Sequence, residues 1–193
     1  MSYNVVSYKN TNIPADVYVT VTNILHDAFE ERLQQGLDFK CGRFTPEDLK
    51  SDLSGQSYLF IAMDENDCPV GTVSLKIRCK MGFVYGGYEN LAVISDYKGK
   101  SVAAVLTDEL IRKSKELNLM FITSSTACNA HSSVRFHQKK GFRIYMRSFG
   151  KKYNSYNFIL PLKKLKLLKI ELLRKVIYVI MTSIAYLKNK NKV

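Results

Sequence analysis

Residues 89–142 read ENLAVISDYKGKSVAAVLTDELIRKSKELNLMFITSSTACNAHSSVRFHQKKGF, and this stretch decides the fold. An apolar run at 91–94 breaks at a polar turn that leads through KGKSVA into a strong helical pattern, and a second apolar run at 119–127 leads into a short helix that ends at Gly141-Phe142. The start of a helix leaves main-chain N–H groups unpaired and carries the positive end of the helix dipole. A basic turn of small residues at that point therefore favours binding of a phosphate.

The stretch resembles the acyl-CoA-binding core of the GNAT superfamily of N-acetyltransferases. In that family a strand ending in a pattern like L-x-V is followed by Q/R-x-x-G-x-G/A at the start of a helix. Here Leu91-Ala92-Val93 supply the strand, and residues 98–103, KGKSVA, lie over the signature. Lys98 replaces the usual Gln or Arg, Ser101 replaces the first signature glycine, and Gly99 gives the turn its freedom two positions earlier.

A second family feature is an N-x-x-S/A segment that leads through an aromatic residue or His to G-F. Residues 130–142 resemble it, with Ser133, Phe136 and His137 in register before Gly141-Phe142. The resemblance covers most of residues 1–160, and it implies that the chain uses acetyl-CoA as co-substrate and needs no metal.

The resemblance implies which residues bind acetyl-CoA. The strand before the turn would bond the pantetheine arm through its main chain, and the turn would hold the pyrophosphate. Ser133 and Phe136 would add two further contacts. The full set of implied acetyl-CoA contacts is Leu91, Ala92, Val93, Lys98, Gly99, Lys100, Ser101, Val102, Ala103, Ser133 and Phe136. The hydroxyl of Ser101 would either bond phosphate or cap the helix. The alternative is a solvated, lysine-rich turn before a capped helix.

Acetyl transfer to an amine needs a group that takes a proton from the ammonium and a group that protonates or stabilises the departing thiolate. Glu89 is the candidate base, because strand alternation places it on one face with Leu91 and Val93. The alternative is a carboxylate that is paired with a lysine or solvated. His137 is the candidate acid, since the family often has a Tyr there and a histidine titrates near neutrality. The alternative is that His137 is a surface residue without a catalytic role. Tyr145 and Tyr85 are weaker candidates for the acid.

The acceptor is expected to be a primary amine of a small molecule or of a protein. The first helix, the loop after it and the last strands would line its pocket, and the candidate residues are Asp38, Phe39, Phe44, Tyr85 and Tyr156. Aromatic residues of a mixed sheet equally serve as core.

Composition and charge limit the classes of protein. The chain has 193 residues, 46% of them hydrophobic, which fits one globular domain rather than a disordered chain. Its four cysteines lack the spacing of a zinc site or a disulfide framework, so we expect reduced thiols in a cytoplasmic protein. Nucleic acid is not an expected partner, because the basic residues come without interleaved arginines or aromatic stacking platforms.

The net charge of +12 is concentrated in residues 161–193, which hold nine Lys or Arg and one Glu. Apolar residues recur there at helical spacing, which predicts a basic amphipathic helix. Its longest uncharged run, 176–187, is 12 residues long, against about 20 for a membrane span. The helix would either lie peripherally on a membrane surface or pack on the body or on a second copy in a homodimer.

The remaining patterns complete an α/β fold with a mixed, mostly antiparallel central sheet flanked by helices. The predicted elements are strands at 3–8, 57–63, 69–79, 143–149 and 153–160, a helix at 16–35 capped by Asp16, and a short helix opened by Thr45-Pro46. We expect an acetyltransferase domain at 1–160 and a helical extension at 161–193. The expected function is direct transfer of acetyl from acetyl-CoA to an amine, and the alternative is a non-catalytic CoA-binding or membrane-surface module.

Overall fold

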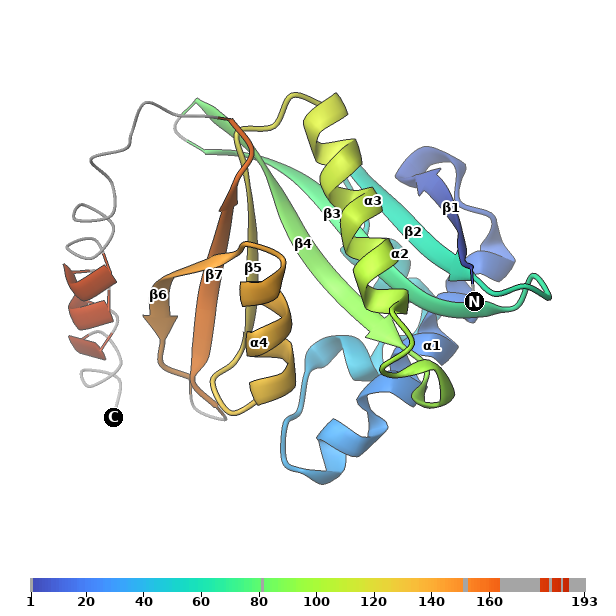
Figure 1. The fold of residues 1–193 in the computed structure, drawn as a ribbon, viewed down its shortest axis with the longest axis horizontal. Helices are drawn as coiled ribbons and strands as arrows, with labels where there is room; N and C mark the ends of the chain where they lie inside the picture. Colours follow the sequence, from blue (N-terminus) through green and yellow to red (C-terminus); the bar gives the residue numbers. More distant parts are fainter. Residues whose placement is uncertain are drawn as a thin grey trace. The chain divides into compact units, whose positions relative to one another are not determined.

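The structure is a computed structural model that describes residues 2–80, 82–150, 153–163, 178–180, 182–184 and 186–187 (Figure 1). The chain divides into two compact units, Met1–Asn118 and Leu119–Val193. The division expected at residue 160 stays a prediction.

The first unit contains four antiparallel strands in the order β1-β2-β3-β4. Two α-helices and two short 3-10 segments lie between β1 and β2, and η3 and α3 follow β4. The bounds are β1 Asn4–Lys9, η1 Asn10–Asn12, α1 Ala15–Gln34, η2 Lys40–Arg43, α2 Pro46–Asp52, β2 Ser57–Met63, β3 Pro69–Lys80, β4 Phe83–Val93, η3 Ser95–Tyr97 and α3 Val102–Glu116.

Helices α1 and α2 pack on one face of this sheet. Leu25 of α1 and Leu49 of α2 have no exposed surface, and they share a core cluster with Leu59 and Ile61 of β2. Helix α2 is short but well anchored, because Thr45 and Asp48 form a reciprocal capping box at its start. The end of α2 therefore has a defined place over the sheet.

Helix α3 packs on the opposite face, and a glycine lets it approach closely. A Cβ built on Gly71 of β3 would lie 2.8 Å from Val102 Cγ1 and 3.2 Å from Leu106 Cδ1. Farther along, the Tyr88 hydroxyl and Thr107 Oγ1 are 3.0 Å apart and buried. The start of α3 is thus fixed against β3 and β4 by packing.

Strand β4 contains a bulge at Asn90. Thr72 lies opposite Ala92 and Ser74 lies opposite Glu89, so three residues of β3 face four of β4. Asn90 adopts a left-handed conformation with φ 55°, as the extra residue of a bulge can do.

The second unit contains β5 Phe121–Ala127, α4 His131–Lys139, β6 Arg143–Ser148 and β7 Ser155–Pro161. Strand β7 lies between β5 and β6 and is antiparallel to both. Phe158 of β7 is fully buried and lies opposite Ser124 of β5.

Part of the predicted C-terminal helix lies outside the described residues, which leave out 164–177, 181, 185 and 188–193. The described residues between 178 and 187 are helical. Within the second unit, Arg147 N donates to Thr182 Oγ1 at 3.3 Å, and the rings of Phe149 and Tyr186 meet at 5.6 Å. None of the described helices is long and apolar enough to cross a bilayer.

The α/β class and the order of the elements are confirmed. Two local expectations were wrong. The strand expected at 91–94 begins at Phe83, because its first residues include a glycine pair and polar side chains that hide the strand pattern. The first helix begins at Ala15 after Pro14, and no side chain caps it, so Asp16 lies inside the helix.

Candidate active site

The turn between β4 and α3 has an unusual backbone. Gly99 has φ 79°, and Ser101, at the N-cap of α3, has φ 69°. Serine rarely adopts this left-handed conformation, which is the one that a glycine adopts freely. Ser101 therefore keeps the backbone shape of the glycine that it replaces. Its side chain makes no capping hydrogen bond, which removes the capping alternative.

Three side chains of the first unit hold this turn. The main-chain N–H of Ser95 donates to Asp27 Oδ1 at 2.6 Å, and Lys98 Nζ lies 3.2 Å from Glu31 Oε2. The Tyr97 hydroxyl donates to Asp64 Oδ2 at 2.5 Å, and this hydrogen bond lowers the pKa of Asp64 and raises the pKa of Tyr97 to about 12. The turn is thus tied to α1 and to the β2–β3 connection.

The turn fits the pyrophosphate of a coenzyme A molecule. Among the described residues, the main-chain N–H groups of Ser101, Val102 and Ala103 have no hydrogen-bond acceptor, as expected for the first turn of a helix. A Cβ on Gly99 would meet no atom within 4 Å, so the turn is open beside it. Lys100 Nζ lies 4.9 Å from the centre of the Tyr97 ring and adds positive charge. Unpaired donors, positive charge and open space are what an anion requires.

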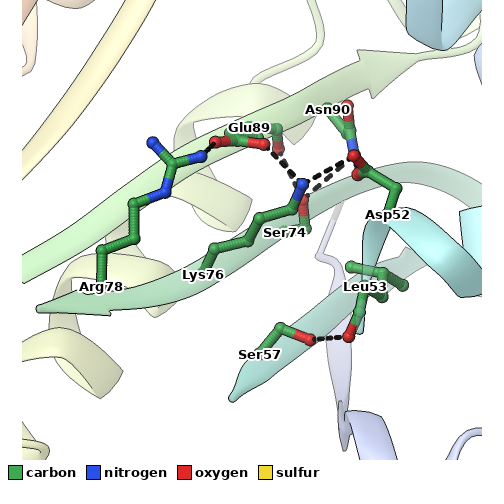
Figure 2. A network of polar contacts seen from close by, with 8 residues as sticks. All are labelled: Asp52, Leu53, Ser57, Ser74, Lys76, Arg78, Glu89 and Asn90. Carbon is green, nitrogen blue, oxygen red and sulfur yellow. Dashed lines mark hydrogen bonds and ion pairs between the residues drawn. The ribbon is translucent and has the colours of Figure 1, made fainter. Parts of the chain in front are cut away.

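Glu89 lies in a network of charges on the β3–β4 face that carries α2 (Figure 2). Its Oε2 lies 2.8 Å from Lys76 Nζ, and its Oε1 forms an ion pair with Arg78. Gly87 makes room for this pair, because a Cβ there would lie 3.1 Å from Glu89 Oε1. The carboxylate is therefore held in place by two cations, and 27% of its side chain is exposed.

The bulge changes which residues share a face with Glu89. Residues that lie opposite each other in a sheet point to the same face, and Glu89 and Ala92 oppose Ser74 and Thr72. Val93 opposes Gly71 on the other face. The expectation that Glu89 and Val93 point the same way was wrong, because Asn90 adds a residue between them.

His137 lies inside the second unit with 3% of its surface exposed. Its Nδ1 lies 2.8 Å from the Ser133 main-chain oxygen, and its Nε2 lies 2.9 Å from Ser124 Oγ. A carbonyl can only accept, so Nδ1 carries a proton, and in the neutral imidazole Nε2 then accepts from the serine hydroxyl. The ring stacks on Phe158 at 4.7 Å, and burial lowers its pKa. Burial therefore favours the neutral imidazole, and the role of His137 as acid stays a prediction.

The other α4 candidates lie beside His137. Ser133 is half-buried and uses its carbonyl to orient the imidazole. The ring of Phe136 meets the ring of His137 edge-on at 6.1 Å. Their predicted contact with acetyl-CoA stays a prediction.

A pocket of about 330 Å³ lies between α1 and the segment that follows it. Phe39 lines it together with His26, Asp27, Phe29, Glu30, Leu33, Leu37, Gly42 and Arg43. The lining combines apolar side chains with the acids Asp27 and Glu30 and with the basic side chain of Arg43. Asp27 and Glu30 lie three residues apart, so helical spacing could have predicted that they share the exposed side of α1.

The five acceptor candidates occupy different environments. Asp38 is 2.6 Å from Arg43, and Phe44 is buried in the core cluster, so the aromatic-as-core alternative describes Phe44 better. Tyr85 of β4 lies opposite Arg78 of β3. Tyr156 lies on β7 of the second unit.

No cluster of His, Cys, Asp or Glu that could hold a metal occurs among the residues that the structure describes. Burial raises the pKa of the Cys41 thiol to about 11.

Comparisons with known proteins bear on this site. The model of the Acetyltransferase (GNAT) family matches residues 18–142. A curated relative, N-alpha-acetyltransferase 30 of Schizosaccharomyces pombe, is 28% identical over 93 residues, which are 48% of this chain and 61% of that protein. The chain thus spans less than two thirds of the length of this relative.

Solved structures share the fold at low sequence identity. The ribosomal-protein-S18-alanine N-acetyltransferase of Escherichia coli gives a TM-score of 0.66 at 11% identity and covers 85% of this chain and 96% of its own. The PaiA N-acetyltransferase of Thermoplasma acidophilum, solved with coenzyme A, gives 0.63 at 13% identity over 83% and 99%.

Proposed function

The chain belongs to the GNAT family of acetyltransferases, since the family model matches more than half of it, and from this premise we propose that it transfers an acetyl group from acetyl-CoA to a primary amine. The observation that carries the proposal is the start of α3. There Ser101 reproduces the backbone of a glycine, and three main-chain N–H groups lack acceptors among the described residues.

We assign acetyl-CoA binding to β4 and to this turn. The main chain of Leu91, Ala92 and Val93 would hold the pantetheine arm, and residues 98–103 would hold the pyrophosphate. Contacts of Ser133 and Phe136 with acetyl-CoA remain part of the proposal. A related fold solved with coenzyme A supports the choice of ligand.

We propose Glu89 as the general base. Acetyl-CoA supplies the acetyl group as a thioester, and the amine must be neutral to attack it. Lys76 and Arg78 fix the orientation of the carboxylate from two sides, and it would take a proton, directly or through a water, on a lone pair that these two cations leave open. No side chain of the chain forms a covalent intermediate in this proposal.

We propose His137 as the acid, and the hydrogen bonds of its ring limit when it can donate a proton. Its Nε2 accepts from Ser124, so it can donate a proton only after it has first gained one and exchanged this partner. Burial lowers its pKa and disfavours that gain. His137→Gln should therefore retain more turnover than Glu89→Gln if the histidine acts only to order α4.

The acceptor that we propose is the α-amine of a protein or peptide. N-alpha-acetyltransferase 30 and the ribosomal-protein-S18-alanine N-acetyltransferase, by their names, act on such amines. The pocket beside α1 suits this class, because Asp27 and Glu30 attract an ammonium while Phe29, Leu33 and Phe39 receive an apolar side chain.

Calorimetric titration with acetyl-CoA tests the binding part of the proposal. We expect a dissociation constant in about the micromolar range for the wild type. Ser101→Trp should abolish binding by filling the turn, whereas Thr11→Trp, at an exposed position of η1 in the same unit, should leave it intact. Absence of binding to the wild type would overturn the proposal.

Turnover with a panel of acceptors tests the rest. We expect acetylation of peptides with a free α-amine and none of the same peptides when blocked. Glu89→Gln should lower kcat while acetyl-CoA affinity holds. Binding of acetyl-CoA without turnover of any amine would favour the non-catalytic CoA-binding module.

A further inference from the structure

Asp52, the last residue of α2, touches β3 and β4 at the same time (Figure 2). Its Oδ1 lies 2.7 Å from Lys76 Nζ, and its Oδ2 accepts from Asn90 Nδ2 at 2.9 Å. Lys76 also binds Glu89, and Asn90 follows Glu89 in the chain. The two carboxylate oxygens of Asp52 therefore reach Glu89 by two routes, one through a side chain and one through the backbone.

The backbone route passes through the bulge. A left-handed conformation is less favourable than a right-handed one at a residue other than glycine, although Asn tolerates it better than most, and it persists where the surroundings hold it. Here Asn90 Nδ2 donates to Asp52, and it lies 3.3 Å from Ser74 Oγ. Ser74 Oγ in turn donates to the main-chain oxygen of Glu89 at 3.2 Å. These bonds fix Asn90 and the carbonyl before it.

The side-chain route is a chain of alternating charges. Asp52, Lys76, Glu89 and Arg78 follow one another and sum to zero. Lys76 and Asp52 are mostly buried, with 15% and 21% of their side chains exposed, so this pair is less screened than one on the open surface. Without Asp52, Lys76 would have only Glu89 as an anionic partner in the network and would draw it out of its present position.

Helix α2 is itself anchored in the core, so it can fix these contacts. Leu49 and Leu53 anchor it in the core with 0% and 1% of their surface exposed. Ser57 Oγ donates to the Leu53 main-chain oxygen at 2.6 Å, which ties the end of the helix to the start of β2. The place of Asp52 is thus set by the core rather than by the charges that it binds.

We propose that Asp52 is a positioning residue of the acetyl-transfer site. It holds the Glu89 carboxylate through Lys76 and the left-handed bulge through Asn90. The inference rests on the proposed function, in which Glu89 is the base. It adds α2, an element that the family signature does not include, to the machinery of the site.

The test compares Asp52→Ala and Asp52→Asn with Glu47→Gln, an exposed charge on the same helix. We expect Asp52→Ala to lower kcat by about ten- to a hundredfold, as small misplacements of a catalytic group do. Asp52→Asn keeps an acceptor for Asn90 but loses the ion pair, so its loss should be intermediate. The KM for acetyl-CoA should change less than kcat does, because the 98–103 turn is untouched although residues 91–93 lie beside the bulge, and Glu47→Gln should change neither constant.

Hydrogen exchange gives a readout that does not depend on activity. Amide exchange in residues 88–93 should speed up in Asp52→Ala and stay unchanged in Glu47→Gln, with the rest of the first unit unaffected. Unchanged exchange at 88–93 in Asp52→Ala overturns the inference, whatever the kinetics show. A wild type without acetyltransferase activity would overturn the proposed function instead, and exchange would still decide whether Asp52 holds the bulge.

Asn90 provides a second pair of variants. Asn90→Gly permits φ 55° but cuts the contact with Asp52, whereas Asn90→Ala also penalises the backbone. We expect kcat to fall in the order wild type, Asn90→Gly, Asn90→Ala. Equal kcat for all three would overturn the backbone route.

Discussion

Helices α2 and α3 begin in opposite ways. At α2, Thr45 Oγ1 accepts from Asp48 N at 3.1 Å, and Asp48 Oδ2 accepts from Thr45 N at 3.0 Å, so two main-chain N–H groups at this helix start are bonded within the protein. At α3, Ser101 is left-handed and makes no such bond. We call the start of α2 the closed start, because its capping groups bond each other. We call the start of α3 the open start, because the N–H groups of Ser101, Val102 and Ala103 have no acceptor among the described residues. Only the open start can donate these hydrogen bonds to an anion.

The largest expected effect comes from placing a negative charge at the open start. Ser101→Asp should weaken acetyl-CoA binding at least about a hundredfold, because a carboxylate near the pyrophosphate costs about 4 kcal/mol at an effective dielectric constant of about 20. Asp also tolerates the left-handed conformation, so the fold should persist. Calorimetry measures the affinity, and circular dichroism checks the fold. Binding at wild-type strength would mean that the pyrophosphate lies elsewhere.

Removing the cap of the closed start should affect stability alone. Thr45→Ala should lower the free energy of unfolding by about 1 kcal/mol, which for a chain of this size lowers Tm by about 2 to 4 °C. Thr20→Ala, an exposed substitution in the middle of α1, is the control. Acetyl-CoA affinity should not change, and a parallel loss of affinity would break the distinction between the two helix starts.

A glycine at the open start should have a smaller effect, and of the opposite sign. Ser101→Gly relieves a left-handed serine and should raise the free energy of unfolding by up to about 1 kcal/mol. Ser54→Gly, at an exposed turn where φ is not positive, should not stabilise. Denaturant unfolding measures both. A destabilised Ser101→Gly would show that the hydroxyl makes a contact of its own.

The smallest effect is a pH dependence confined to the closed start. Hydrogen bonds from the main chain and side chain of Thr45 lower the pKa of Asp48. A lowered carboxylate pKa contributes stability above the unfolded value of about 3.9, and that contribution is lost as the pH falls through the lowered pKa. The difference in Tm between wild type and Asp48→Asn should therefore be present at about pH 6 and vanish at about pH 2. If the difference in Tm persisted at about pH 2, it would come from packing rather than from the charge of Asp48.

The local features of the sequence predicted the structure best. Thr45-Pro46-Glu47-Asp48 predicts the closed helix start within four residues, and Gly99 predicts the left-handed turn. Each depends on interactions between near neighbours in the chain. The order of elements followed from the same kind of local pattern.

The features that were missed depend on distant residues. Asn90 is held left-handed by Asp52, which lies 38 positions away, so the bulge and the face change after Glu89 leave no local signal. The surroundings of His137 depend in the same way on Phe158 and Ser124. Sequence alone could name Glu89 and His137 as candidates, but it could not show that one is held by two cations and the other is buried and neutral.

The close packing of α3 on β3 has a consequence for mutational tolerance. Gly71 has no left-handed backbone of its own, yet a Cβ there would collide with Val102, the first residue of α3. In a library that varies every position, glycine should be retained at 71 because of its neighbours, while position 99 should accept Asn because only its backbone is demanding. Even alanine at position 71 would push α3 away from the sheet and displace the turn at its start.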